Sequence, residues 1–97
     1  MASNTSARRF VVHGRVQGVG FRYFVEHAAN DLSLTGYVKN RADGSVEVYA
    51  GGDLDRLGKL KERLADGPRW ARVERIDESE AEPQASLDAT AGFHITY

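Results

Sequence analysis

The chain has 97 residues, of which 41% are hydrophobic and 28% are charged, and its formal net charge is −1. These values are typical of one small soluble globular domain, and they argue against a disordered, fibrous or membrane-spanning chain and against a general nucleic-acid binder. The sequence has no cysteine and only 3 scattered histidines, which excludes disulfides and a thiolate nucleophile and leads us to expect no metal site and no other cofactor.

Residues 1–7, MASNTSA, are small and polar and lack the apolar core of a signal peptide. They predict a disordered tail ahead of a single domain over residues 8–97, and they indicate a cytoplasmic protein. Within that domain, residues 8–16, RRFVVHGRV, predict a first strand because they alternate in character and include several β-branched side chains.

The segment GRVQGVGFR, residues 14–22, overlaps the end of that strand and contains glycines and arginines but no acidic residue. From Phe21 onward the apolar side chains recur at helical spacing, which predicts a helix as far as about Leu32. The glycine-rich segment therefore connects a strand directly to the N-terminus of a helix.

Residues 35–52, TGYVKNRADGSVEVYAGG, predict a β-hairpin. A two-residue turn would divide the apolar side chains between the two faces of the hairpin, although one face should be buried. A three-residue loop over residues 42–44 instead places Val38 opposite Val48 and keeps the apolar side chains together. In this register Asn40 shares the buried face that the helices cover.

The rest of the chain predicts one more helix and two more strands. The helix begins after Asp53, a candidate N-cap, and ends before Gly67-Pro68. Its apolar stripe consists of Leu54, Leu57, Leu60 and Leu64. Residues 71–79 predict a strand, residues 80–92 a loop, and residues 93–97, FHITY, a short last strand whose alternate side chains share one side.

This order of elements predicts an α+β, ferredoxin-like βαββαβ sandwich, in which two helices cover one face of an antiparallel sheet and a short extra strand follows at the C-terminus. In this topology the first strand runs up to the glycine-rich segment, the first helix runs back, and the second strand returns to the same end. Asn40, near the end of the second strand, is therefore expected beside the glycine-rich loop.

A glycine-rich loop that leads into a helix N-terminus can direct successive backbone N–H groups at one point, where an anion would bind. Arg22 adds a planar guanidinium that matches two oxygens of a phosphate. The segment lacks the Gly-Lys-Ser/Thr of a Walker loop, and Tyr23 stands where a dinucleotide fingerprint needs glycine or alanine, which disfavours ATP and NAD. Taken separately, the glycines could form an ordinary turn and Asn40 could be a capping residue, but their convergence favours a site.

The segments GRVQGVGFR and GYVKNRADGSVEVYAGG closely resemble the acylphosphatase family, and the similarity extends over residues 8–97, including GPRWARVERID and FHITY. The resemblance implies a hydrolase that converts acyl phosphates to a carboxylate and inorganic phosphate without a metal. It also implies that Arg22 binds the phosphoryl group and that Asn40 positions the attacking water. The backbone amides of the phosphate-binding loop would come from Gln17, Gly18, Val19, Gly20 and Phe21.

The resemblance implies a small-molecule acyl phosphate as the partner and inorganic phosphate as a product or competitive inhibitor; we expect a monomer and neither a nucleic-acid nor a membrane partner. One alternative is the acylphosphatase-like module of large carbamoyltransferases used in hydrogenase maturation. The end of the chain at 97, the lack of cysteine motifs and Tyr23 in place of a proline disfavour it. The other alternative is an RNA-binding βαββαβ module, for which SVEVYAGG supplies only one aromatic residue, Tyr49.

Overall fold

The computed structural model describes residues 5–83 and 92–97, which form two helices and five strands. The elements in chain order are β1 (Ser6–Arg15), α1 (Phe21–Asp31), β2 (Thr35–Asn40), β3 (Val46–Gly52), α2 (Leu54–Asp66), β4 (Arg72–Ala81) and β5 (Phe93–Ile95). This order confirms the predicted sequence of elements. Residues 1–4 of the predicted tail and 84–91 of the predicted loop lie outside the described residues. The predicted tail is too long, because Ser6 and Ala7 belong to β1, where Ala7 is buried between Gly51 of β3 and Ala81 of β4.

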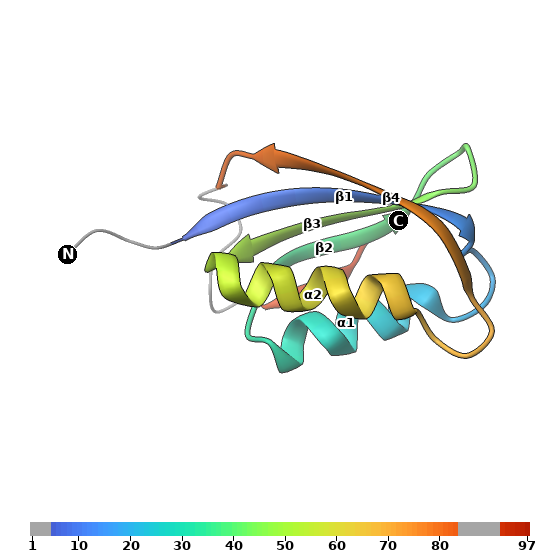
Figure 1. Ribbon diagram of the computed structural model, residues 1–97, viewed down its shortest axis with the longest axis horizontal. Coiled ribbons are helices and arrows are strands. Elements are labelled where there is room, and N and C mark those ends of the chain that lie inside the picture. Colours follow the sequence, from blue (N-terminus) through green and yellow to red (C-terminus); the bar gives the residue numbers. More distant parts are fainter. Residues whose placement is uncertain (1–4, 84–91) are drawn as a thin grey trace.

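The strands form one sheet in the order β4-β1-β3-β2-β5, and both helices lie against the same face of it (Figure 1). The ferredoxin-like fold is therefore confirmed, with one correction to the sheet. β5 pairs parallel to β2, while all other neighbours are antiparallel, so the sheet is mixed. The reason is topological: β4 ends at the end of the sheet where β2 begins, and β5 starts from there and runs in the same direction as β2.

The predicted register of the β2–β3 hairpin is confirmed. Val38 pairs with Val48. The backbone N–H of Arg41 donates to the carbonyl of Ser45 at 2.8 Å, which leaves residues 42–44 as the loop. The apolar side chains of the hairpin consequently share the face that packs against the helices.

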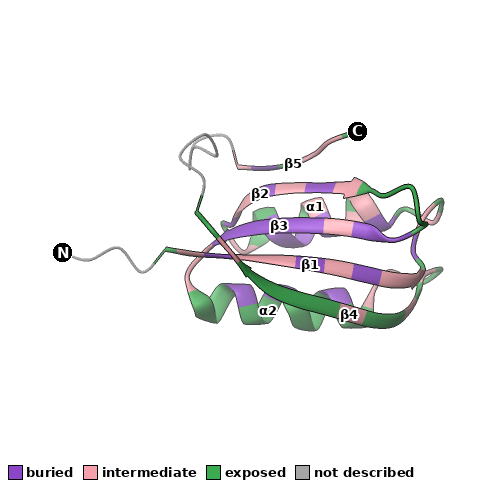
Figure 2. Cartoon of the chain, turned by 90° about the horizontal axis from the view of Figure 1, so that it is seen from above, coloured by how far each residue is buried: buried purple, intermediate pink, exposed green. Residues whose placement is uncertain are grey.

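The core lies between the sheet and the two helices, and Figure 2 shows buried residues along β1, β2 and β3 while β4 is exposed for most of its length. Leu57, Leu60 and Leu64 of the predicted leucine stripe are buried. Leu54 is 57% exposed, contrary to the prediction, because it is the first residue of α2 and lies at the open end of the helix. None of the described helices reaches the length and hydrophobicity needed to span a lipid bilayer.

The two helices begin in different ways. In α2 the predicted cap is present, since the Asp53 carboxylate accepts a hydrogen bond from the backbone N–H of Arg56 at 2.8 Å. In α1 the N-cap residue is Gly20, which supplies no side-chain acceptor, and no acidic residue lies in the first turn. Within residues 5–83 and 92–97, the first N–H groups of α1 are therefore uncapped.

Candidate active site

The glycine-rich segment connects β1 to α1 through two residues in the left-handed region. Gly18 has a φ of 73° and Gly20 a φ of 78°. A Cβ atom at either position would meet nothing within 4 Å, so space is available there. It is the backbone conformation that requires glycine, because side chains disfavour these φ values by about 1–2 kcal/mol.

The backbone N–H groups of this connection find no acceptor in the part of the chain that the structure describes. The first hydrogen bond of α1 runs from the N–H of Phe24 to the carbonyl of Gly20, at 3.1 Å. For the N–H groups of residues 17–23, no acceptor is present in the described part of the chain. Uncapped N–H groups at a helix N-terminus, together with the positive end of the helix dipole, form an environment suited to an anion.

A cavity of about 110 Å³ lies at this end of the sheet and brings distant segments of the sequence together. Its lining residues are Val16, Gly18, Gly20, Phe21, Arg22, Tyr23 and Asn40. They come from the end of β1, the start of α1 and the end of β2. The expected convergence of Asn40 with the glycine-rich loop is therefore present, whereas Gln17 and Val19 do not line the cavity.

Asn40 occupies the last position of β2, two residues after the buried Val38 and on the same face of the sheet. Its side chain is nevertheless exposed, because the helices do not cover the end of the strand. The side-chain amide has no hydrogen-bond partner among residues 5–83 and 92–97. It can therefore both accept from and donate to a molecule bound in the cavity.

Arg22 is half-buried and forms no ion pair with a carboxylate within the described residues. Its guanidinium carbon lies 4.8 Å from the centre of the Tyr97 ring. A cation–π contact of this kind holds a guanidinium without neutralising its charge. The sequence analysis did not identify Tyr97 as part of the site, although its position in FHITY places it on the side of Phe93 and Ile95.

The side chain of Gln17 was also missed, since only its backbone amide was considered. Its Nε2 donates to the carbonyl of Arg41 at 2.8 Å and to the carbonyl of Ser45 at 2.9 Å. These contacts join the glycine-rich loop to the β2–β3 hairpin. No local sequence signal indicates them, because they depend on how two distant loops meet in space.

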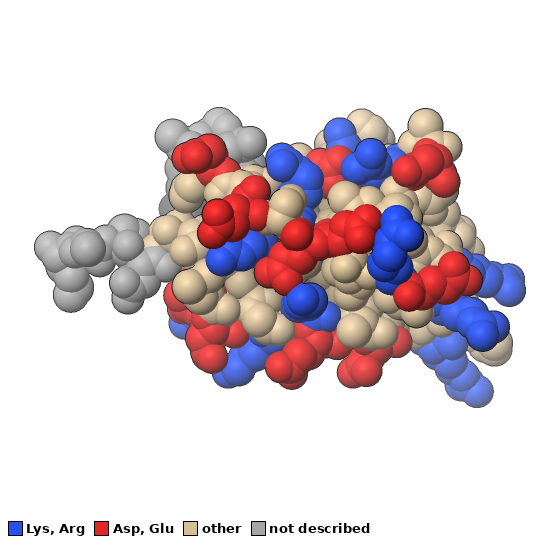
Figure 3. Space-filling model, turned by 45° about the horizontal axis from the view of Figure 1, so that its top comes forward, with Lys and Arg blue, Asp and Glu red and all other residues tan. Residues whose placement is uncertain are grey.

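Positive charge extends beyond the cavity at this end of the molecule. Arg15 and Arg72 face each other across the β1–β4 pair, both are exposed, and neither forms an ion pair in the described part of the chain. In Figure 3 several Lys and Arg side chains project from the right-hand end, which is where the β1–α1 connection lies in Figure 1. A surface of this sign attracts anions toward the cavity.

No carboxylate and no imidazole of the described residues line the cavity. Hydrogen bonds from Ser45 lower the pKa of Asp43, and Arg75 lowers the pKa of Asp77, but neither carboxylate reaches the cavity. Among the described residues, no three His, Asp or Glu side chains are grouped as metal ligands. Among the described lining residues, the polar groups are the guanidinium of Arg22, the carboxamide of Asn40, the hydroxyl of Tyr23 and backbone N–H groups.

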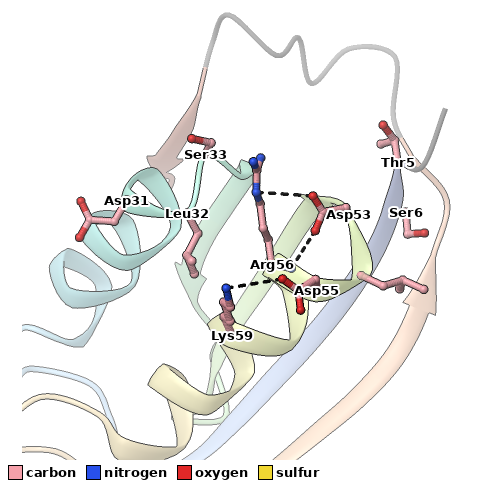
Figure 4. Close-up of a pocket in the computed structure, with 10 residues that line it drawn as sticks. Thr5, Ser6, Asp31, Leu32, Ser33, Asp53, Asp55, Arg56 and Lys59 are labelled. Atoms are coloured by element: carbon pink, nitrogen blue, oxygen red, sulfur yellow. Dashed lines mark hydrogen bonds and ion pairs between the residues drawn. The ribbon is translucent and has the colours of Figure 1, made fainter.

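A larger cavity, of about 880 Å³, lies at the opposite end of the sheet, beside the start of α2 (Figure 4). Each of its charged side chains has a partner: Arg56 lies 3.5 Å from Asp53, Lys59 lies 3.5 Å from Asp55, and Asp31 lies 3.6 Å from Arg63, which is outside the lining. These pairs neutralise its charge, in contrast to the small cavity, where Arg22 has no carboxylate partner in the described residues.

A family model described as acylphosphatase matches residues 8–95. The chain is 51% identical to an acylphosphatase from Koribacter versatilis over 87 residues, which are 90% of this chain and 79% of that protein. The crystal structure of acylphosphatase from Bacillus subtilis matches with a TM-score of 0.87 at 39% identity, covering 95% of this chain and 99% of that chain. HypF from T. kodakarensis matches with a TM-score of 0.79 at 34% identity, covering 95% of this chain but 12% of that one.

Proposed function

This chain belongs to the acylphosphatase family, and we propose that it hydrolyses acyl phosphates to a carboxylate and inorganic phosphate at the small cavity. The observation that carries the proposal is the meeting, in one cavity, of an arginine without a carboxylate partner among the described residues, a loop with free N–H groups and an exposed carboxamide. Each of these groups suits one part of a phosphoryl-transfer reaction.

Binding of the phosphoryl group is assigned to the glycine-rich loop and Arg22. We assign the cradle to the backbone amides of Gln17, Gly18, Val19, Gly20 and Phe21, of which Gly18, Gly20 and Phe21 line the cavity and Gln17 and Val19 are their neighbours in the chain. The guanidinium adds two parallel N–H donors and a positive charge. In a loose transition state, charge gathers on the equatorial oxygens of the phosphoryl group, and preorganised donors of this kind stabilise it. These donors supply the positive charge from the protein itself, so the proposed reaction uses no metal.

The leaving group explains why no acid is required beside it. The bond that breaks joins phosphorus to a carboxylate oxygen, and that carboxylate leaves with the bonding electron pair. Its conjugate acid has a pKa of about 4, so it departs as an anion without protonation. A cavity whose described lining residues include no carboxylate or imidazole is sufficient for such a substrate.

Asn40 is assigned to the attacking water. Its carboxamide oxygen accepts a hydrogen bond from the water and orients a lone pair toward phosphorus, in line with the leaving oxygen. A carboxamide does not accept a proton at neutral pH. The water proton therefore passes to a phosphoryl oxygen of the substrate, and the products are a carboxylate and protonated inorganic phosphate.

Hydrolysis of benzoyl phosphate in water enriched in oxygen-18 tests this reaction directly. Attack at phosphorus places the label in inorganic phosphate and leaves benzoate unlabelled. Label in benzoate would show attack at the carbonyl carbon and would contradict the assignments of Arg22 and Asn40. Failure of the wild-type protein to accelerate the reaction would contradict the proposed activity itself.

The two alternative functions receive less support. The match to HypF includes only a small share of that protein, whereas both acylphosphatases are matched over most of their length. For RNA binding, a stacking platform on the open face of the sheet would need accessible rings. Tyr49 is 1% exposed, and its hydroxyl donates to the carbonyl of Glu82, so its ring is not available to a base.

A further inference from the structure

The Gln17 side chain makes two hydrogen bonds with one amide group. Its Nε2 lies 2.8 Å from the carbonyl oxygen of Arg41 and 2.9 Å from that of Ser45. A primary amide has two N–H donors, so both are used. Two acceptors therefore define the orientation of this side chain. Arg41 directly follows β2, and Ser45 directly precedes β3.

These two acceptors close the loop of the β2–β3 hairpin. The carbonyl of Ser45 also accepts from the N–H of Arg41 at 2.8 Å, and the carbonyl of Arg41 accepts from the N–H of Gly44 at 3.1 Å. Arg41 directly follows Asn40 in the chain. Gln17 is therefore bound one residue away from the carboxamide assigned to the attacking water.

This connection lies beyond the end of the ladder that links β1, β3 and β2. β1, which leads into the glycine-rich loop, and β2, which ends at Asn40, are separated by β3 in the strand order. Val46 of β3 pairs with Val12 on one side and with Asn40 on the other, so the sheet itself sets the spacing of Asn40 from β1, but this ladder ends at Val12 and does not include residues 16–22. In the described chain, the two bonds from Gln17 are the only hydrogen bonds that join residues 16–22 to residues 40–46.

We propose that Gln17 is a positioning residue, which fixes Asn40 relative to the phosphate-binding loop through these two side-chain hydrogen bonds. The inference rests on the proposed function. Phosphoryl binding depends on the loop and Arg22, which lie on one side of this connection, whereas water attack also depends on Asn40, which lies on the other. Loss of the connection should then lower turnover and leave phosphate affinity nearly unchanged, because a misplacement of about 1 Å costs about 10²-fold in rate.

Gln17→Met is the informative variant, because methionine has a similar length, keeps the backbone N–H and cannot donate. The two carbonyl oxygens retain their backbone donors, so neither is left unpaired. We expect kcat for benzoyl phosphate to fall by about 10- to 100-fold, while the inhibition constant of inorganic phosphate changes by less than about 3-fold. A loss of phosphate affinity as large as the loss of kcat would overturn the proposal.

A double-mutant cycle with Asn40→Ala separates positioning from a general structural effect. If Gln17 acts through Asn40, Gln17→Met should lower kcat no further once Asn40 is alanine. If the two losses multiply, the side chain acts independently of Asn40 and the proposal fails. Should Gln17→Met not fold, Gln17→Asn serves in its place, since its shorter side chain cannot reach both carbonyls.

Asp43→Ala is the matched control. It removes the hydrogen bonds that the Asp43 carboxylate accepts from the Ser45 N–H, at 2.9 Å, and from the Ser45 hydroxyl, at 2.5 Å, and so loosens the hairpin loop without removing a contact of Gln17. We expect kcat to remain within about 2-fold of wild type. An equal loss of kcat in Asp43→Ala and Gln17→Met would show that hairpin stability alone is responsible. An inactive wild-type protein would instead refute the proposed function.

Discussion

Replacing Arg22 with lysine keeps the positive charge but removes the planar pair of donors. A lysine ammonium can make one strong hydrogen bond where the guanidinium makes two, and the lost bond to a charged phosphoryl group is worth about 1.5–3 kcal/mol. Arg22 also stacks on the Tyr97 ring with its guanidinium carbon 4.8 Å from the ring centre. Loss of much of that contact adds about 0.5–1 kcal/mol.

Together these losses amount to about 2–4 kcal/mol of transition-state stabilisation, which corresponds to a fall in kcat/KM of about 30- to 900-fold. The assay is the initial rate of benzoyl phosphate hydrolysis, followed by its ultraviolet absorbance, with phosphate as competitive inhibitor. Because the same donors bind the product, the inhibition constant of phosphate should rise as well.

Arg15→Lys is a matched control within the same glycine-rich segment, since Arg15 is exposed and does not line the cavity. Its kcat/KM should stay within about 3-fold of wild type. If Arg22→Lys retained activity at that level too, the bidentate binding of the phosphoryl group would be refuted.

Three further changes test separate parts of the structure. Gly20→Ala should lower the free energy of unfolding by about 1–2 kcal/mol, because Gly20 has a φ of 78°, and it should also weaken phosphate binding. An unchanged midpoint of urea denaturation would contradict the requirement for a left-handed backbone at this position. Tyr97→Leu should raise the phosphate inhibition constant by about 2- to 5-fold, because the contact with Arg22 is lost. An unchanged inhibition constant would show that this contact does not hold the guanidinium. Asp53→Ala should lower the free energy of unfolding by about 1 kcal/mol through loss of the α2 cap, while kcat/KM, measured on the same sample, should not change.

The sequence predicts the hairpin register and the position of Asn40 for a definite physical reason. A shift by one residue would move every apolar side chain of the hairpin to the other face, so Val38 has to lie opposite Val48, as the structure confirms. The strand-helix-strand order then returns Asn40 to the end of the sheet where the glycine-rich loop lies. The alternation of buried and exposed side chains along each strand and the order of the connections are sufficient to predict both the hairpin register and the position of Asn40.

Other features depend on contacts that no local sequence pattern predicts. β5 has only 3 residues, and its parallel pairing with β2 follows from the path of the chain around the sheet. The contact between Arg22 and Tyr97 joins two segments far apart in the chain, as do the bonds from Gln17 to the hairpin. The sequence therefore predicts the groups that face a substrate better than the contacts that hold those groups in place.

Phosphoryl binding and water attack are assigned to different sides of one cavity, and Asn40→Ala tests that division most directly. The measurement is kcat for benzoyl phosphate together with the inhibition constant of inorganic phosphate, for the variant and the wild type. We predict a fall in kcat of about 10²-fold with phosphate inhibition unchanged within about 2-fold. Full activity of the variant, or a loss of phosphate binding in proportion to the loss of kcat, would contradict the account.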